Sequence, residues 1–152
     1  MKRLLLSFVL GLALCALGSS SAMAAGPEGA QKAPLFEQPA EPEDGCIAGG
    51  PPGTTSGFAV LNTPGNEMAV AGEVSLKRAA PHTTYDVIVE QHFEPGETGC
   101  FETFAGTLTT NKKGNGNAHI NVARVPTTTT FSVELEGVFG EPEFVTSEVE
   151  LD

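Results

Sequence analysis

Apolar and polar residues alternate along most of the chain, and this alternation limits the possible folds more than any other feature. Side chains of a β-strand point to its two faces in turn, so a period of two indicates strands with one face on a core and one in water. The segments that alternate are 58–62, 67–77, 83–93, 101–110, 117–122, 131–139 and 145–151. After the first 24 residues, no segment has the 3.6-residue period of an amphipathic helix.

Residues that break strands mark all the connections between these segments. Five connections each contain a proline, which has no N–H for a sheet ladder. The sixth, residues 111–116, is rich in Asn and Gly, which tolerate a positive φ. Seven strands in about 95 residues, without a helix, predict an all-β fold: a seven-stranded antiparallel immunoglobulin-like sandwich. A single closed barrel is the alternative.

Individual strands assign particular side chains to the core. Tyr85 lies on the apolar face of the clearest segment, 83–93, and is therefore expected in the core. In the less regular segment 101–110, Phe104 and Leu108 are expected to point inward. Both predictions depend on an uninterrupted alternation within each strand.

The first 24 residues have the pattern of a signal peptide. Lys2 and Arg3 precede an apolar run over residues 4–18, and Ala22 and Ala24 supply the small residues that signal peptidase requires before Ala25. The apolar run is about 15 residues long, shorter than the roughly 20 that span a bilayer. We therefore expect a secreted protein, extracellular or periplasmic, with no retained transmembrane segment.

Residues 25–56 differ in composition from the domain predicted over residues 57–152. They contain six of the eleven prolines and several acidic residues, a composition that buries too little apolar surface to offset chain entropy. We interpret this stretch as a disordered N-terminal arm that acts as a spacer. In the alternative interpretation it is a recognition tail, with Leu35 and Phe36 as a small apolar anchor.

Two cysteines, Cys46 and Cys100, follow the predicted cleavage site. An even pair in an exported chain predicts a disulfide. This bond would close a loop of about 55 residues and stabilise the fold by roughly 4 kcal/mol. The alternative, a pair of metal-binding thiolates, lacks the neighbouring Cys or His residues of a zinc site.

The charge of the chain excludes two classes of partner. Eight Lys and Arg residues face 19 Asp and Glu residues, a formal net charge of −11. Nucleic acid and anionic lipid surfaces are both bound through clustered basic residues. We therefore expect a monomer that binds neither of them, and whose partner is an unknown extracellular protein or small molecule.

The histidines do not form a recognisable metal site. His82 and His92 bracket one predicted strand, and ten extended residues place them about 33 Å apart. A shared metal would need both nitrogens within about 2 Å of the ion. His119 lies at an outward position on another segment. Glu90 and His92 share a predicted face, so a weak surface metal site is the alternative to solvent-exposed histidines.

The residues also lack a recognisable catalytic pattern. No Gly-x-Ser-x-Gly motif is present, and Ser132 and Ser147 fit as ordinary strand residues. Four acidic residues lie at outward strand positions, as expected for a solvated sheet face: Glu134, Glu136, Glu148 and Glu150. A catalytic carboxylate pair is defined by its separation in space, which alternation does not give. We expect no enzyme activity, no cofactor and no metal.

Two stretches resemble a known family. These are VAGEVSLKRAAPHTTYDVIVEQ (70–91) and GTLTTNKKGNGNAHINV (106–122). Their turn and strand rhythm resembles that of secreted bacterial immunoglobulin-like modules and, in part, of the neocarzinostatin-type apoproteins, small acidic sandwiches that carry a chromophore. The resemblance implies a β-sandwich and, for the chromophore carriers, a ligand cleft. Those carriers normally have two disulfides, whereas this mature chain can form one, and no site residue is carried over.

The sequence therefore predicts a secreted, non-catalytic β-sandwich that acts as an interaction or structural module. The alternative is an extracellular small-ligand carrier with an apolar cleft, and a hydrolase is the third hypothesis.

Overall fold

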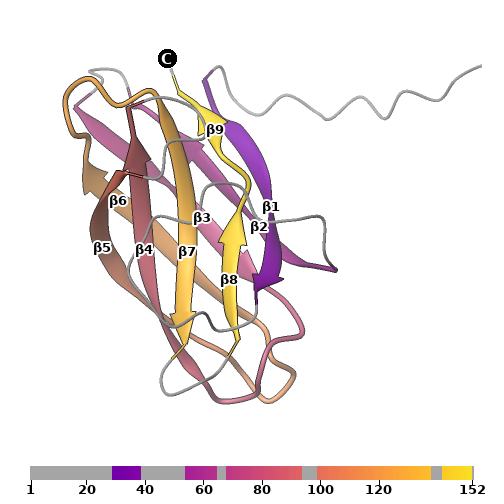
Figure 1. The fold of residues 1–152 in the computed structure, drawn as a ribbon. Helices are drawn as coiled ribbons and strands as arrows, with labels where there is room; N and C mark the ends of the chain where they lie inside the picture. Colours follow the sequence, from indigo (N-terminus) through magenta and orange to yellow (C-terminus); the bar gives the residue numbers. More distant parts are fainter. Residues whose placement is uncertain (1–28, 39–53, 65–67, 94–98, 138–141, 152) are drawn as a thin grey trace, which may run out of the picture.

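The computed structural model describes residues 29–38, 54–64, 68–93, 99–137 and 142–151. The fold is all-β, and every strand pairing is antiparallel (Figure 1). The strands are β1 (Gln31–Gln38), β2 (Thr55–Asn62), β3 (Ala69–Leu76), β4 (Thr84–His92), β5 (Cys100–Thr109), β6 (Gly116–Ala123), β7 (Thr130–Gly137), β8 (Glu143–Thr146) and β9 (Val149–Glu150). Within the described residues, no helix is long and apolar enough to cross a bilayer.

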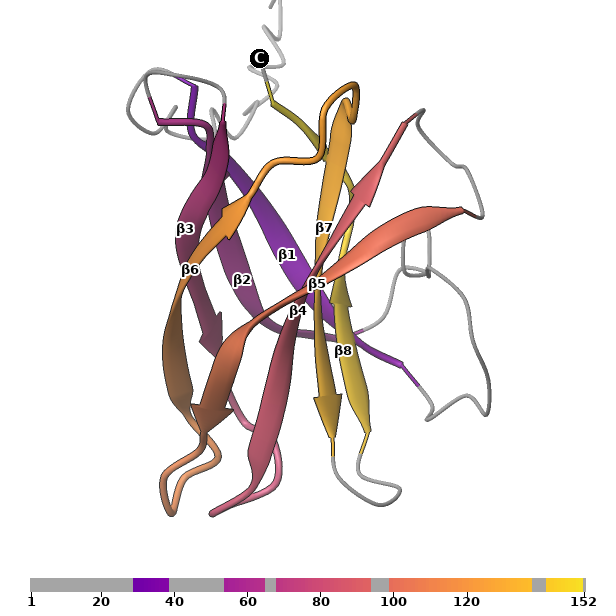
Figure 2. The ribbon, with the colours of Figure 1, turned by 90° about the vertical axis from the view of Figure 1, so that its left-hand side faces the viewer.

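The strands form one sheet that curls into a nearly closed barrel. Their order is β5-β4-β7-β8-β1-β2-β3-β6, and β9 pairs with β7. The two end strands, β5 and β6, are joined by the turn at residues 110–115. They lie close together near that turn and diverge toward the opposite end of the barrel (Figure 2).

One side chain links the diverging strands across the inside of the barrel. The amide nitrogen Nε2 of Gln91, on β4, donates to Thr103 Oγ1 on β5 at 3.1 Å and to the Ala123 carbonyl at the end of β6 at 3.0 Å. The backbone N–H of Val125 donates to Gln91 Oε1 at 2.8 Å. Gln91 is fully buried, so these bonds compensate for its lost hydration.

Apolar side chains from all parts of the sheet meet inside the barrel. Tyr85 and Phe144 pack edge to face, with ring centroids 5.6 Å apart, which confirms the predicted core position of Tyr85. The buried cluster also contains Leu35, Ala59, Leu61, Val70, Val74, Leu76, Val87, Val89, Leu108, Ile120, Val122, Phe131, Val133, Leu135 and Leu151. This single core explains the alternation seen in the sequence.

The number and arrangement of strands differ from the prediction, although the all-β antiparallel class is confirmed. Each of the seven predicted segments contains a strand, and the last is divided into β8 and β9. The additional strand is β1, which pairs with β8 on one side and β2 on the other. It joins β5-β4-β7-β8 to β2-β3-β6, so one barrel-like sheet replaces the expected sandwich.

The expectation of a disordered arm is wrong for residues 31–38. Ala33 and Leu35 are buried in β1, and these apolar contacts order a segment that its prolines would otherwise disfavour. Pro34 is compatible with this strand because the pairing with β8 begins only at Leu35. The predicted signal peptide, residues 1–24, and most of the remaining arm lie outside the described residues.

Candidate functional site

A polar cluster lies on the outward positions of β4 and β7. Glu90 is directly opposite Ser132 in the strand register, and both side chains are fully buried, as is His92. Ser132 Oγ donates to Glu90 Oε2 at 2.5 Å, and His92 Nε2 lies 3.2 Å from Ser132 Oγ. His92 Nε2 is also 4.0 Å from Glu90 Oε2.

This cluster contradicts the expectation of solvent exposure for His92, whereas His82 and His119 are exposed as expected. His92 has 0% of its surface exposed, and Ser132, interpreted from the sequence as an ordinary strand residue, contacts both an acid and an imidazole. Alternation assigns a residue to a face of the sheet but does not say whether that face is solvated. The polarity of Glu90 and His92 favoured the solvated interpretation.

The geometry of this cluster does not favour nucleophilic catalysis. A catalytic serine passes its proton to a base while the substrate carbonyl lies next to Oγ. Here the hydroxyl donates to a carboxylate, and all three side chains are 0% exposed, so a substrate does not reach Oγ. The contacts of Glu90, His92 and Ser132 are those of a buried polar network, in which His92 Nδ1 has no hydrogen-bond partner within the described part of the chain.

Glu134 lies beside this network on β7, opposite Ile88 of β4 and Val145 of β8. Burial, followed by the charges of Glu90, Glu143, Glu136 and Glu102, raises the pKa of Glu134 to about 7. Glu134 is half-buried, so the predicted solvation of this position holds only in part. Among the other outward acids, Glu136 and Glu150 are exposed and Glu148 is half-buried.

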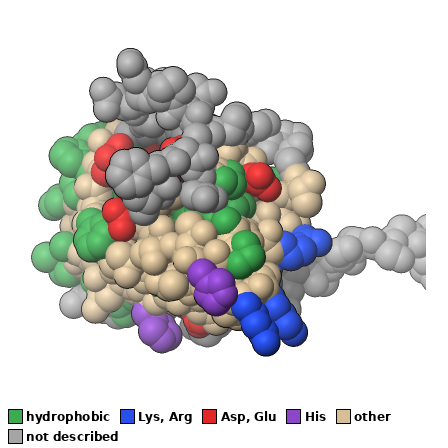
Figure 3. Space-filling model, turned by 90° about the horizontal axis from the view of Figure 1, so that it is seen from below, with side chains coloured by type: hydrophobic (Ala, Val, Ile, Leu, Met, Phe, Trp, Pro, Cys, Tyr) green, Lys and Arg blue, Asp and Glu red, His purple; other side chains and the backbone are tan. Residues whose placement is uncertain are grey.

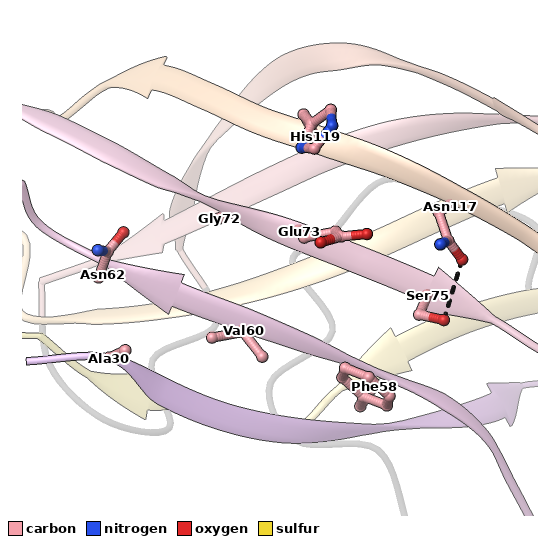
Figure 4. A pocket seen from close by; sticks show the side chains of 9 residues that line it. All are labelled: Ala30, Phe58, Val60, Asn62, Gly72, Glu73, Ser75, Asn117 and His119. Atoms are coloured by element: carbon pink, nitrogen blue, oxygen red, sulfur yellow. Dashed lines mark hydrogen bonds between the residues drawn. The ribbon is translucent and has the colours of Figure 1, made fainter. Parts of the chain in front are cut away.

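A shallow hollow of about 450 Å³ lies on the other half of the barrel, over the outer face of β2, β3 and β6 (Figure 4). The backbone of Gly72 also lines it; this position has the parity of the buried Val70 and Val74, and it requires glycine because a Cβ there would lie 1.9 Å from the Val60 carbonyl oxygen. Five polar side chains surround the hollow: Asn62, Glu73, Ser75, Asn117 and His119. Periodicity within a single strand does not reveal this group, because its members come from three strands.

Strand register pairs the polar residues of the hollow. Glu73 is opposite His119, and Ser75 is opposite Asn117, to whose Oδ1 the Ser75 hydroxyl donates at 3.0 Å. Glu73, Asn117 and His119 are exposed. Phe58 lines the hollow as well (Figure 4). The hollow therefore offers hydrogen-bond donors and acceptors to a polar ligand.

Exposed aromatic side chains mark the β4–β5 end of the sheet. Phe93, Phe101 and Phe104 are 40%, 47% and 62% exposed. The rings of Phe93 and Phe101 pack edge to face, with centroids 5.5 Å apart. We call Phe101 and Phe104, together with the backbone of β5 between them, the aromatic edge.

The prediction that Phe104 points inward is wrong, although Leu108 is buried as predicted. A β-bulge explains the difference. Val87 pairs with Gly106 and Ile88 pairs with Phe104, which leaves Ala105 without a partner on β4. Gly106 has a φ of +135°, a conformation that favours glycine. The extra residue reverses the parity of β5, so Phe104 shares the outward face with Ile88.

The remaining predicted site residues do not come together. His82 lies in the connection before β4, His92 is buried on β4, and His119 is exposed on β6. In the described part of the chain, no group of three or more His, Cys, Asp or Glu residues could hold a metal ion. Cys100 begins β5, but Cys46 lies outside the described residues, so their disulfide stays a prediction.

Comparisons with known proteins add no family. No protein-family model matches the chain, and no match was found among curated proteins. The antiparallel all-β architecture is the part of the predicted resemblance that the structure supports.

Proposed function

We propose that this protein is an exported, non-catalytic module that binds another protein through the aromatic edge. The observation that carries the proposal is the exposure of Phe101 and Phe104, 47% and 62%, on an end strand of the sheet. Large exposed aromatic side chains are enriched at protein interfaces, where they bury much apolar area. The signal-peptide pattern supports an extracellular or periplasmic location.

The packing of the barrel supports an outer binding surface over an enclosed one. Side chains from both halves of the sheet form one buried apolar cluster in the interior. An apolar ligand inside the barrel would have to displace part of this core. This weighs against the hypothesis of a carrier with an apolar cleft.

Site-specific photo-crosslinking in the producing organism tests the proposal. Benzoylphenylalanine at position 101 should form one discrete adduct with an exported protein, while the same group at Lys112, an exposed turn residue, should not. The adduct at position 101 should disappear when Phe104→Ser is added. Equal adducts at positions 101 and 112, or none at either, would contradict the proposal.

A second candidate function is binding of a small polar ligand in the hollow. The five hydrogen-bonding side chains around Gly72 favour it. Native mass spectrometry of protein purified from its own secretion medium should then show a bound mass. The double variant Glu73→Ala, Asn117→Ala should lose this mass, and its retention would exclude the hollow as the site.

An exported location also supports the disulfide between Cys46 and Cys100. The intact mass of freshly secreted protein should be about two daltons lower than that of the reduced protein, because each disulfide removes two hydrogens. Two free thiols, detected by alkylation without prior reduction, would contradict the disulfide.

A further inference from the structure

We propose that the aromatic edge binds an extended, basic segment of its partner by strand addition, in which the partner segment pairs with the free side of β5. This inference names the partner chemistry of the proposed interaction function and rests on that function. Three features of the described residues carry it: the free side of β5, the aromatic side chains on both of its faces, and the charge of the neighbouring strands.

The first feature is the free side of β5. Among the described strands, β5 pairs only with β4. Its first residues lie where it diverges from β6, away from the turn that joins the two strands (Figure 2). Exposed edge strands are normally protected against pairing by Pro, Lys or very short length. This strand has ten residues, no Pro and a single charged residue, Glu102.

The second feature is the position of the two aromatic side chains. Phe101 is opposite Gln91, which points into the barrel, whereas Phe104 is opposite Ile88 on the outward face. An added strand would therefore have an aromatic neighbour on each of its faces. Main-chain bonds supply affinity in strand addition, and contacts to alternate side chains supply selectivity. The bulge at Ala105 ends the regular part of this edge, which limits pairing to about residues 101–104.

The third feature is the charge beside the edge. Strands β4, β5, β7 and β8 contain no Lys or Arg. They contain six acidic residues: Asp86, Glu90, Glu102, Glu134, Glu136 and Glu143. Of these, Asp86, Glu102 and Glu136 are exposed, Glu134 and Glu143 are half-buried, and Glu90 is fully buried. Seen from below, Lys and Arg side chains gather on one side of the molecule, while hydrophobic side chains protrude on the opposite side (Figure 3).

This distribution selects a basic partner over an acidic one or a second copy of the chain. Glu102 and Asp86 are exposed on the outward face beside Phe104, and Glu134 is half-buried on the same face. Burial raises the pKa of Glu134 most, and the like charges of neighbouring acids raise it further; a cationic side chain would relieve this second effect. Two copies of a chain with a net charge of −11 repel each other.

Three synthetic peptides test the inference on the full mature protein. The first alternates Lys with Val over eight residues, the second replaces each Lys with Glu, and the third carries N-methyl groups on alternate backbone nitrogens of the Lys peptide. Fluorescence anisotropy gives the affinities. We expect the Lys peptide to bind at least tenfold more tightly than either of the others, and to weaken as salt is added.

Variants locate the binding surface. Phe104→Ser and Glu102→Lys should each weaken binding of the Lys peptide at least fivefold, whereas Met68→Ser, at an exposed apolar side chain before β3, should leave it unchanged. Circular dichroism and thermal unfolding check that each variant is folded. The alternate amide protons of residues 101–104 that are directed away from β4 should exchange more slowly with solvent in the presence of the Lys peptide, because strand addition pairs them.

Several results would overturn the inference. Equal affinity for the Lys and Glu peptides would refute the basic partner, and equal affinity for the N-methylated peptide would refute strand addition. Dimerisation lost in Phe104→Ser would show that a second copy occupies the edge. If no peptide binds but the crosslink at position 101 forms, strand addition by a basic segment is refuted while the proposed interaction function stands. If neither the peptide binding nor the crosslink is observed, both proposals fail.

Discussion

The two outer faces of the barrel follow the same alternation but differ in exposure. On β3 and β6, the outward residues Glu73, Asn117 and His119 are exposed. On β4 and β7, the outward residues Glu90, His92 and Ser132 are fully buried and bond to one another, whereas Asp86 and Glu136, farther along these strands, are exposed. A buried polar group without a partner is costly, so the second face needs an internal network and the first does not. Polarity alone therefore does not identify a solvated surface.

Tyr85→Ala should have the largest effect, since it removes a side chain from the core that lies behind both faces. Tyr85 is fully buried and packs against Phe144. We expect a loss of roughly 3 kcal/mol or more in the free energy of unfolding, because truncation of a buried aromatic side chain leaves a cavity. Urea denaturation measures it. A loss below about 1 kcal/mol would mean that the core tolerates the cavity.

Ser132→Ala and Ser75→Ala compare the two faces directly. Ser132→Ala removes the hydroxyl between Glu90 and His92 and leaves a buried carboxylate without this donor, at a cost of about 2 to 3 kcal/mol. Ser75→Ala removes one bond to the exposed Asn117 and should cost about 1 kcal/mol or less. Ser75 is itself buried, so equal losses in urea denaturation would show that the exposure of the hydrogen-bond partner does not decide the cost.

Glu134→Gln tests the electrostatics of the buried face. Folding raises the pKa of Glu134 from 4.5 to about 7, so the folded state holds this proton more tightly than the unfolded state does. The contribution of Glu134 to stability is therefore fully present below about pH 4.5 and is lost as the pH rises through about 7. Relative to Glu134→Gln, the wild-type protein should lose stability over this interval.

The matched control for this pH dependence is Glu73→Gln on the exposed face. Between pH 4.5 and 7, the free energy of unfolding of Glu73→Gln should change with pH as it does in the wild-type protein. Urea denaturation at a series of pH values measures both variants. The raised pKa of Glu134 would be contradicted if the wild-type protein gained stability relative to Glu134→Gln as the pH rises.

His119→Ala should have the smallest effect on folding. The side chain is exposed on β6, and surface substitutions of this kind change stability by about 0.5 kcal/mol or less. Thermal unfolding at neutral pH measures the change. A loss above about 1 kcal/mol would mean that the hollow contributes to the fold in addition to offering polar groups.

Much of the sheet could be predicted from the sequence, but little of the candidate site. Alternation located each of the seven segments and placed Tyr85 and Leu108 in the core. The hollow and the aromatic edge could not be found in this way. Their residues come from different strands, and only the register brings Glu73 opposite His119.

The sequence by itself determined which segments become strands and, within a regular strand, which residues share a face, because both follow from the period-two geometry of the extended backbone. Tertiary structure alone decided three other features. β1 joins two groups of strands into one sheet, the extra residue Ala105 turns Phe104 outward, and burial converts Glu90, His92 and Ser132 into an internal network. Each depends on contacts between residues distant in the chain, which local periodicity does not encode.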